Sequence, residues 1–279
     1  RTGERDHVTT TLRLTKHHGL GNDFLVAIDP PVDGDARLAE LARQVCDRRR
    51  GIGADGLLVA TGVGGALVRM VLYNADGSRA EMSGNGIRCF AQAVVAAGGG
   101  SAAELRVRTD AGERVVVVAP TEDPATILAS VDMGAVEPIG PPDHWDALGC
   151  HPDRPVAHLS VGNPHSVVGV EDVDVVDLQA LGEKVPTTNL EIVEPGEHQH
   201  HIRMRVHERG AGITEACGTG ACAAAVAAAN WGLATPRDGK LIVEMDGGSA
   251  TVELESPAPG RVTLTGPATY VGTIEIEIA

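Results

Sequence analysis

Two short glycine-rich turns in this 279-residue chain combine the residue types needed for proton transfer beside a carboxylate. They read Ser83-Gly84-Asn85-Gly86 and Cys217-Gly218-Thr219-Gly220, and an alanine-rich, helix-like segment follows each. A helix N-terminus presents unpaired N–H groups and a partial positive charge, which bind carboxylates. Glycine lets the backbone approach such a ligand closely. The turns therefore predict a site for an anionic group, flanked by the side chains of residues 83 and 217.

This arrangement suits removal and return of a proton at the α-carbon of an amino acid. A two-base epimerase needs one group to take the proton and another to deliver a proton to the opposite face. We expect the helix end to lower the pKa of the Cys217 thiol and make it a better base. The N–H groups would stabilise charge on the carboxylate in the transition state, in place of a cofactor. Because one Gly-x-Gly turn is often only a tight turn, the prediction depends on having two.

The elements that must position these turns are duplicated along the chain. Residues 69–98 and 203–232 align at an offset of 134, with eight identities in one register. Each copy has a strand-like run (68–73 and 202–207), polar turns, the Gly-x-Gly and an apolar helix. A second similarity relates residues 21–26 to residues 162–167, at an offset of 141. The repeat predicts two α/β halves related by a pseudo-twofold.

We therefore predict an α/β (α+β) fold in which each half is a curved, mostly antiparallel sheet around a central helix. The N-terminal half is expected at residues 12–134, joined by a last strand at 270–279, and the C-terminal half at 135–269. Helices are expected at residues 37–49, 87–97, 176–184 and 220–231. Further strands are expected at residues 105–109, 114–119, 127–133, 241–245, 251–254, 261–264 and 273–278.

Composition argues against several classes of partner. A net charge of −15 disfavours nucleic acid, and the basic run Arg48-Arg49-Arg50 is more typical of a solvated helix end. No apolar run reaches the roughly 18 residues of a membrane span, and the polar residues 1–11 do not resemble a signal peptide. Five cysteines without a CxxC pair favour a reducing compartment. We therefore expect a cytoplasmic protein with no nucleic-acid or membrane partner.

The sequence also gives little evidence for a cofactor-binding or metal-binding site. None of the three lysines, Lys16, Lys184 and Lys240, lies in a recognisable pyridoxal site. Gly19-x-Gly21 and Gly51-x-Gly53 lack the third glycine and helix of a dinucleotide fingerprint. The run Glu197-His198-Gln199-His200-His201 could bind a metal but is more typical of a polar loop. We expect neither a cofactor nor a metal.

Several motifs resemble those of the diaminopimelate epimerase family. In chain order they are His18-Gly19-Leu20-Gly21-Asn22-Asp23-Phe24, residues 47–56, residues 74–78, residues 84–89, Gly162-Asn163-Pro164-His165, and residues 208–220. The last run is the most specific, and together the motifs extend from about Leu14 to the C-terminus. The resemblance implies a pyridoxal-independent conversion of LL- to meso-diaminopimelate, toward lysine and peptidoglycan, by a homodimer of two pseudo-symmetric halves.

The resemblance also implies roles for individual residues. Cys217 would be one catalytic thiol, and the α-carboxylate of the reacting centre would be held by Gly84, Asn85, Gly218 and Thr219. The distal amino-acid end would be fixed by Asn22, Asn74, Asn163, Asn189 and Arg209, with Glu208 accepting a hydrogen bond from an ammonium group. Amide side chains suit a zwitterion, and the planar guanidinium suits a carboxylate.

Two residues depart from the family pattern. Ser83 stands where the family has its first catalytic cysteine, and Gly56 stands where some members carry a polar side chain. A serine hydroxyl is far less acidic than a thiol and needs a partner base, and Cys89, about two turns into the helix, cannot replace it. Ser83 is compatible with a Cys-to-Ser variant of low activity, or with a natural serine enzyme that epimerises slowly or eliminates. Alternatives are a proline racemase or hydroxyproline dehydratase type of enzyme, and a non-catalytic amino-acid-binding homologue.

Overall fold

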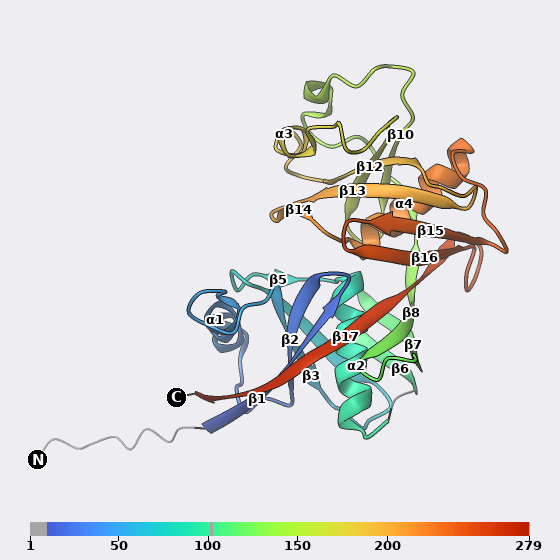
Figure 1. The fold of residues 1–279 in the computed structure, drawn as a ribbon. Helices are drawn as coiled ribbons and strands as arrows, with labels where there is room; N and C mark the ends of the chain where they lie inside the picture. Colours follow the sequence, from blue (N-terminus) through green and yellow to red (C-terminus); the bar gives the residue numbers. More distant parts are fainter. Residues whose placement is uncertain (1–9, 101–102, 279) are drawn as a thin grey trace, which may run out of the picture.

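The computed structural model describes residues 10–100 and 103–278, which form two lobes (Figure 1). In the N-terminal lobe, α2 (Gly84–Ala97) is surrounded by β1 (Thr10–Gly19), β2 (Asn22–Ile28), β3 (Gly56–Thr61), β4 (Val68–Asn74), β5 (Arg79–Ala80), β6 (Ala103–Thr109), β7 (Gly112–Pro120) and β8 (Thr126–Ala135). Helix α1 (Asp35–Cys46) packs outside this sheet, against β3 and β4.

The C-terminal lobe repeats this plan around α4 (Gly218–Trp231). Its strands are β9 (Glu137–Pro138), β10 (Val156–Ser160), β11 (Pro164–Gly169), β12 (Asn189–Pro195), β13 (His201–Glu208), β14 (Gly212–Thr214), β15 (Lys240–Met245), β16 (Gly248–Leu254) and the first part of β17 (Arg261–Ile278). The short helices α3 (Leu178–Gly182) and η1 (Trp145–Leu148) lie on its outside, where they cover a small separate apolar cluster.

Strand pairing confirms the predicted pseudo-symmetric α+β fold. Most pairs are antiparallel, and the parallel pairs occur at equivalent places: β2 with β3 and β4 with β6 in one lobe, β11 with β12 and β13 with β15 in the other. Helices α2 and α4 begin and end 134 residues apart, the offset of the sequence repeat. Both helices are almost entirely buried in one continuous apolar core.

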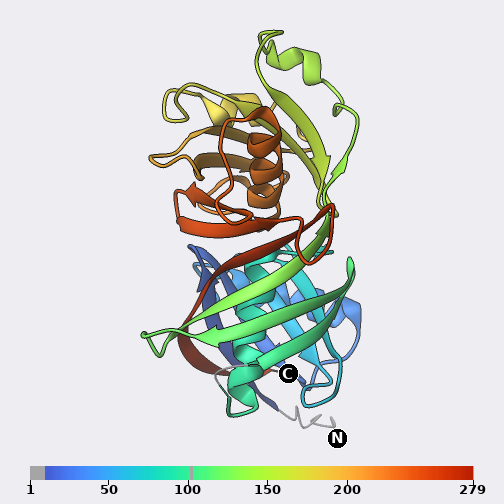
Figure 2. The same ribbon diagram turned by 90° about the vertical axis from the view of Figure 1, so that its right-hand side faces the viewer.

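Two long antiparallel strands, β8 and β17, join the lobes (Figure 2). Strand β17 pairs with β16 in the C-terminal lobe and then with β1 in the N-terminal lobe. The prediction of separate strands at 261–264 and 273–278 was wrong, because Gly266 and Pro267 do not break this strand. Glycine at 266 leaves room for the buried Arg88, since a Cβ there would lie 3.1 Å from Cζ of Arg88.

The helix boundaries also differ from those predicted. Helices α2 and α4 begin at Gly84 and Gly218 rather than at residues 87 and 220, because the side chains of Ser83 and Cys217 cap them. Helix α3 is shorter than the predicted 176–184, and α1 occupies Asp35–Cys46 rather than 37–49. Thr10 and Thr11 belong to β1, and the rest of the polar segment 1–11 lies outside the described residues. Within the described ranges, no helix is long and apolar enough to cross a membrane.

Candidate active site

The two glycine-rich turns adopt the same backbone geometry at the starts of α2 and α4. Ser83 and Cys217 are extended N-cap residues, with φ of −138° and −129°. Ser83 Oγ accepts a hydrogen bond from the Gly86 N–H at 3.0 Å, and Cys217 Sγ accepts one from the Gly220 N–H at 3.4 Å. The two side chains therefore have equivalent places in the lobes, as the repeat predicted.

The structure brings the two turns into contact between the lobes. A Cβ added to Gly84 would lie 3.0 Å from Cα of Gly218, so the two backbones touch. Asn85 Nδ2 donates to the carbonyl of Ala216 at 3.0 Å, which ties the first turn to the residue directly before Cys217. Asn85 is 2% exposed and Cys217 4%, so this arrangement is closed. A substrate would need the lobes to part before it could reach the turns.

Among the described residues, the first backbone N–H groups of both turns have no acceptor in the protein and are available to an anion. The first N–H groups of a helix have no acceptor within the helix, and here only the third is bonded to the capping side chain. Those of Gly84 and Asn85, and of Gly218 and Thr219, belong to two helix starts whose backbones touch. Two helix N-termini on one carboxylate would stabilise it by hydrogen bonds and by their partial positive charge.

The environment of Cys217 overturns the expectation of a lowered thiol pKa. Burial raises the pKa of Cys217 well above its ordinary value, and the nearby carboxylates of Glu208 and Glu191 raise it further. The Thr219 hydroxyl, 3.5 Å from Sγ, and the Gly220 N–H oppose this but are outweighed. The helix end does lower the pKa, as the sequence predicted, but burial and the two acids raise it by more. Cys217 is therefore held as a thiol at neutral pH.

Glu208 is the carboxyl group that accepts a hydrogen bond from the Cys217 thiol. Burial raises the pKa of Glu208, whereas hydrogen bonds from Thr214 and from the Cys217 thiol lower it. Thr214 Oγ1 is 2.5 Å from Glu208 Oε1, which fixes the carboxyl group at the end of β13. Glu208 can accordingly accept a proton from Cys217 or bind a substrate ammonium.

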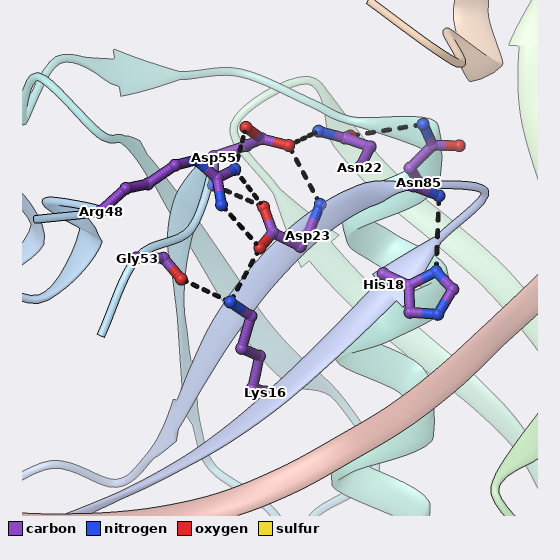
Figure 3. Close-up of polar contacts among 9 residues, drawn as sticks. Lys16, His18, Asn22, Asp23, Arg48, Gly53, Asp55 and Asn85 are labelled. Atoms are coloured by element: carbon purple, nitrogen blue, oxygen red, sulfur yellow. Dashed lines mark hydrogen bonds and ion pairs between the residues drawn. The ribbon is translucent and has the colours of Figure 1, made fainter. Parts of the chain in front are cut away.

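The wall of the site in the N-terminal lobe is a chain of ion pairs that the sequence did not reveal (Figure 3). Asp23 bonds to Lys16 at 2.9 Å and to Arg48 at 2.6 Å. Arg48 also reaches Asp55 at 2.8 Å, and Asp55 accepts from Asn22 Nδ2 at 2.6 Å. Arg48 is thus more than the solvated helix end that its basic run suggested. This series of ion pairs and hydrogen bonds orients the side-chain amide of Asn22 toward the turns.

The remaining predicted ligands lie at the ends of strands around the turns. Asn22 Oδ1 accepts from Asn85 Nδ2 at 3.3 Å. Asn163 Nδ2 donates to Thr219 Oγ1 at 3.4 Å. Asn189 Oδ1 accepts from the backbone N–H of Arg209, whose side chain is exposed.

Asn74 is the predicted ligand least connected to the turns. It is exposed at the end of β4 and donates to Ser78 Oγ at 3.0 Å. By the repeat offset it is the counterpart of Glu208. Unlike Glu208, however, Asn74 is exposed, so a substrate would reach it only at the rim of the site.

Three buried polar residues were not singled out as site residues from the sequence. Arg88, on α2, donates to the carbonyl of Gly84 at 3.0 Å and to Asn85 Oδ1 at 2.7 Å, and so holds the first turn. His165 Nδ1 lies 2.7 Å from Glu191 Oε1, with both side chains fully buried beneath the second turn. A glutamate in the apolar run Asn189-Leu190-Glu191-Ile192-Val193 was the signal that could have found this pair.

The histidine run lies far from the turns and shows no metal geometry. The rings of His200 and His201 pack edge to face at 4.5 Å, and His201 Nδ1 lies 2.6 Å from Glu244 Oε1. Among the described residues, no group of three His, Cys, Asp or Glu side chains is arranged to hold a metal ion.

Comparison with known proteins identifies relatives along nearly the whole chain. A family model described as diaminopimelate epimerase matches residues 14–139 and 158–271. A diaminopimelate epimerase of Synechococcus elongatus is 39% identical, covering 96% of this chain and 99% of its own length. Diaminopimelate epimerases of Moorella thermoacetica and Bacteroides thetaiotaomicron are 40% and 38% identical, over 93% and 97% of this chain and 97% and 100% of theirs.

Solved structures share the fold at much lower identity. A phenazine biosynthesis protein of the PhzF family from Bacillus anthracis has a TM-score of 0.77 at 16% identity, covering 96% of this chain and all of its own. A hydroxyproline epimerase from Agrobacterium vitis, with trans-4-hydroxy-L-proline bound, has a TM-score of 0.67 at 16% identity, covering 96% and 92%. These likenesses establish the fold alone.

Proposed function

The chain belongs to the diaminopimelate epimerase family of isomerases, and on that premise we propose that it interconverts LL- and meso-diaminopimelate without a cofactor. In the reaction one group removes the α-proton as the Cα–H bond breaks, and the opposite group gives its proton to Cα from the other face. Glu208 first takes the proton of Cys217, the resulting thiolate removes the α-proton from one face, and the hydroxyl of Ser83 gives its proton to Cα from the other face. Solvent then returns a proton to Ser83 and takes one from Glu208. The product is a precursor for lysine and peptidoglycan.

The contact between Gly84 and Gly218 is the observation that carries this proposal. It brings the N-termini of two helices together between the lobes, one capped by Ser83 and the other by Cys217. A carboxylate held there would put its own α-carbon between the two side chains. Charge developing on the carboxylate during deprotonation would meet N–H groups already in place.

Ser83 makes the proton-transfer groups on the two faces of the substrate α-carbon chemically unequal. A hydroxyl is a weaker acid and a weaker base than a thiol unless a partner activates it. The hydrogen bond described for Ser83 Oγ comes from the Gly86 N–H and supplies no base. We therefore expect slow epimerisation, with proton exchange at one stereoisomer faster than at the other.

Proton exchange measured by NMR tests the proposal. The protein is incubated with LL-, meso- or DD-diaminopimelate in deuterated water, and the loss of the α-proton signal and the change of configuration are followed separately. Exchange that outpaces inversion for one isomer supports the proposal. Binding of every isomer without exchange would instead identify a non-catalytic amino-acid-binding homologue. Exchange with proline or hydroxyproline but not with diaminopimelate would identify a proline racemase type of enzyme.

The proposal extends to assembly and location. The family resemblance implies a homodimer, and Tyr270 and Val271 of β17 leave apolar surface exposed, at 39% and 57%. All five cysteines are free, which suits a reducing cytoplasm. Light scattering at micromolar concentration tests the dimer.

A further inference from the structure

Arg88 carries a positive charge into the core of the N-terminal lobe. Its side chain is fully buried on α2. Within the described residues, the hydrogen bonds that it donates end on neutral oxygens, namely the carbonyls of Gly84 and Pro267 and Oδ1 of Asn85. These acceptors solvate the guanidinium but do not balance its charge. An unbalanced charge is costly in an interior of low dielectric constant.

No carboxylate in the described part of the chain forms an ion pair with Arg88. The ionisable groups that face it are the thiols of Cys89, on the same helix, and of Cys222, on α4. Burial raises the pKa of both thiols to about 12, so both are neutral at pH 7. Burial also lowers the pKa of Arg88 to about 10, which still leaves the guanidinium protonated at pH 7. Arg88 is therefore a cation without a counter-ion.

The backbone around Arg88 is shaped to admit this side chain beneath the first glycine-rich turn. A Cβ on Gly19 of β1 would lie 3.2 Å from Nη2 of Arg88, and one on Gly266 of β17 would lie 3.1 Å from its Cζ. Glycine at both positions lets the two strands pass closely over the guanidinium. The counterpart of Arg88 by the repeat offset of 134 is Cys222, so a thiol stands in the second lobe where the first has a cation.

The peptide group between Gly84 and Asn85 links Arg88 to the anion site. Arg88 Nη1 donates to the Gly84 carbonyl at 3.0 Å, and this carbonyl belongs to the same peptide group as the N–H of Asn85. A hydrogen bond to the oxygen of a peptide polarises the group and strengthens its N–H as a donor, by roughly 10–30% per bond. Among the described residues, the Asn85 N–H has no acceptor. A carboxylate there would meet a donor that is reinforced by a full positive charge.

We propose that the α-carboxylate of the substrate is the counter-ion of Arg88, which acts on it through the Gly84–Asn85 peptide group. Arg88 is a positioning residue, since it holds the first turn and strengthens its N–H donor without touching the reacting atoms. The N-terminal turn accordingly binds the carboxylate more tightly than the C-terminal turn, where Cys222 replaces the cation. This inference deepens the proposed function, and only the identity of the molecule that carries the carboxylate rests on that function.

Acetate tests the inference, because it presents a carboxylate without the rest of a substrate. It is titrated into the whole protein at constant ionic strength, and amide NMR follows the N–H signals of Asn85 and Thr219. In the parent we expect acetate to shift both signals, and Asn85 further than Thr219, because the stronger hydrogen bond moves its proton further downfield. An Asn85 signal that does not respond, or a larger shift at Thr219, would overturn the inference.

Arg88→Met removes the charge and should weaken acetate binding by about tenfold, the effect of weakening one charge-assisted hydrogen bond. Acetamide, the neutral isostere of acetate, separates charge from structure. Its weaker binding should agree within about twofold between the parent and Arg88→Met. The control is Arg106→Met, which removes an exposed charge from the same lobe and should leave acetate affinity within about twofold. Equal losses for acetate and acetamide, or an unchanged acetate affinity in Arg88→Met, would contradict the role of the charge.

The side-chain Nε–H signal of Arg88 tests the coupling in the parent, so the inference stays testable if Arg88→Met does not fold. We expect acetate to shift this signal with the same midpoint as the Asn85 N–H. A fixed Nε–H signal beside a responding Asn85 would overturn the inference. A protein that binds acetate in this way but exchanges no α-proton of diaminopimelate would refute the proposed function alone. Exchange of diaminopimelate with acetate binding independent of Arg88 would refute the inference alone.

Discussion

Gly84 and Gly218 face each other so closely that a Cβ on Gly218 would lie 2.9 Å from Cα of Gly84. Leu264 of β17 packs against both, with Cδ2 at 2.9 Å from that same added Cβ. Neither glycine has the positive φ that would require glycine for backbone reasons. Their small size therefore serves the approach of the two helix N-termini, and the width of the anion site depends on it.

Gly218→Ala should push the two turns apart. We expect proton exchange to fall by about 100-fold, the effect of an ångström-scale misplacement of reacting groups. Stability should fall by about 1–3 kcal/mol, as for an overpacked core. Exchange by NMR and urea unfolding measure the two effects. The control is Gly98→Ala at the end of α2, where the added Cβ meets atoms no closer than 3.5 Å. Equal behaviour of the two variants would show that the turns do not need this contact.

The sequence predicted the paired turns because their pattern is local and repeated. Ser83 and Cys217 differ by the repeat offset of 134, and the structure places them as equivalent helix caps. The fold class followed from the same repeat, since two copies of a strand, turn and apolar helix must bury their helices in similar ways.

Three features depended on tertiary contacts that no local pattern encodes. Asp23 meets Lys16 and Arg48 only after β1, β2 and the segment after α1 have packed together. Strand β17 continues through Gly266 and Pro267 because it pairs across both lobes. The pKa of Cys217 is raised rather than lowered, because burial and two glutamates from β12 and β13, close in space but not adjacent in sequence, outweigh the helix end.

Arg88→Met should destabilise the protein strongly. The guanidinium is fully buried and bonds to neutral acceptors, the Gly84 carbonyl, Asn85 Oδ1 and the Pro267 carbonyl, and burial lowers the pKa of Arg88 to about 10. Its loss leaves these acceptors unsatisfied, which costs about 3 kcal/mol. Urea unfolding measures it against Arg106→Met, an exposed arginine paired with Glu113, where we expect less than about 1 kcal/mol. A similar midpoint for both variants would contradict the anchoring role of Arg88.

Asp23→Asn should weaken the protein at neutral pH but not in acid. Burial alone would raise the pKa of Asp23, but hydrogen bonds from Arg48 and Lys16 outweigh it and lower the pKa. A lowered native pKa contributes stability above the unfolded value near pH 4, and that stability is lost as the pH falls further. We expect Asp23→Asn to cost about 2 kcal/mol at pH 7, with the difference from the parent shrinking toward pH 3.

Unfolding midpoints from pH 3 to 7 measure the effect of Asp23→Asn. The control is Asp174→Asn, which breaks an exposed pair with Arg203 and should change the midpoint little. A difference that stayed constant across the range would show that the charge of Asp23 is not responsible.

Cys217→Ser should slow proton exchange strongly and abolish its dependence on pH. Because burial, Glu208 and Glu191 raise the pKa of Cys217, the thiolate fraction of the parent grows through pH 7 to 9, and exchange should grow with it. The serine variant should lose at least about 100-fold in exchange rate and show no such rise. Cys150→Ser, on the outer surface of the same lobe, should match the parent. A rise that survives in Cys217→Ser would assign the titration to another group.

Ser83→Cys should convert a one-sided exchanger into an efficient epimerase. Ser83 Oγ lies 3.0 Å from the Gly86 N–H, and Cys217 Sγ has the equivalent bond at 3.4 Å, so a thiol fits the cap without rearrangement. With thiols on both faces, we expect inversion to rise by about 100-fold or more and both isomers to exchange at similar rates. Ser249→Cys adds a thiol at an exposed position of β16 and should leave the rates unchanged. If Ser83→Cys gave no increase in inversion, residue 83 would not lie at the reacting centre.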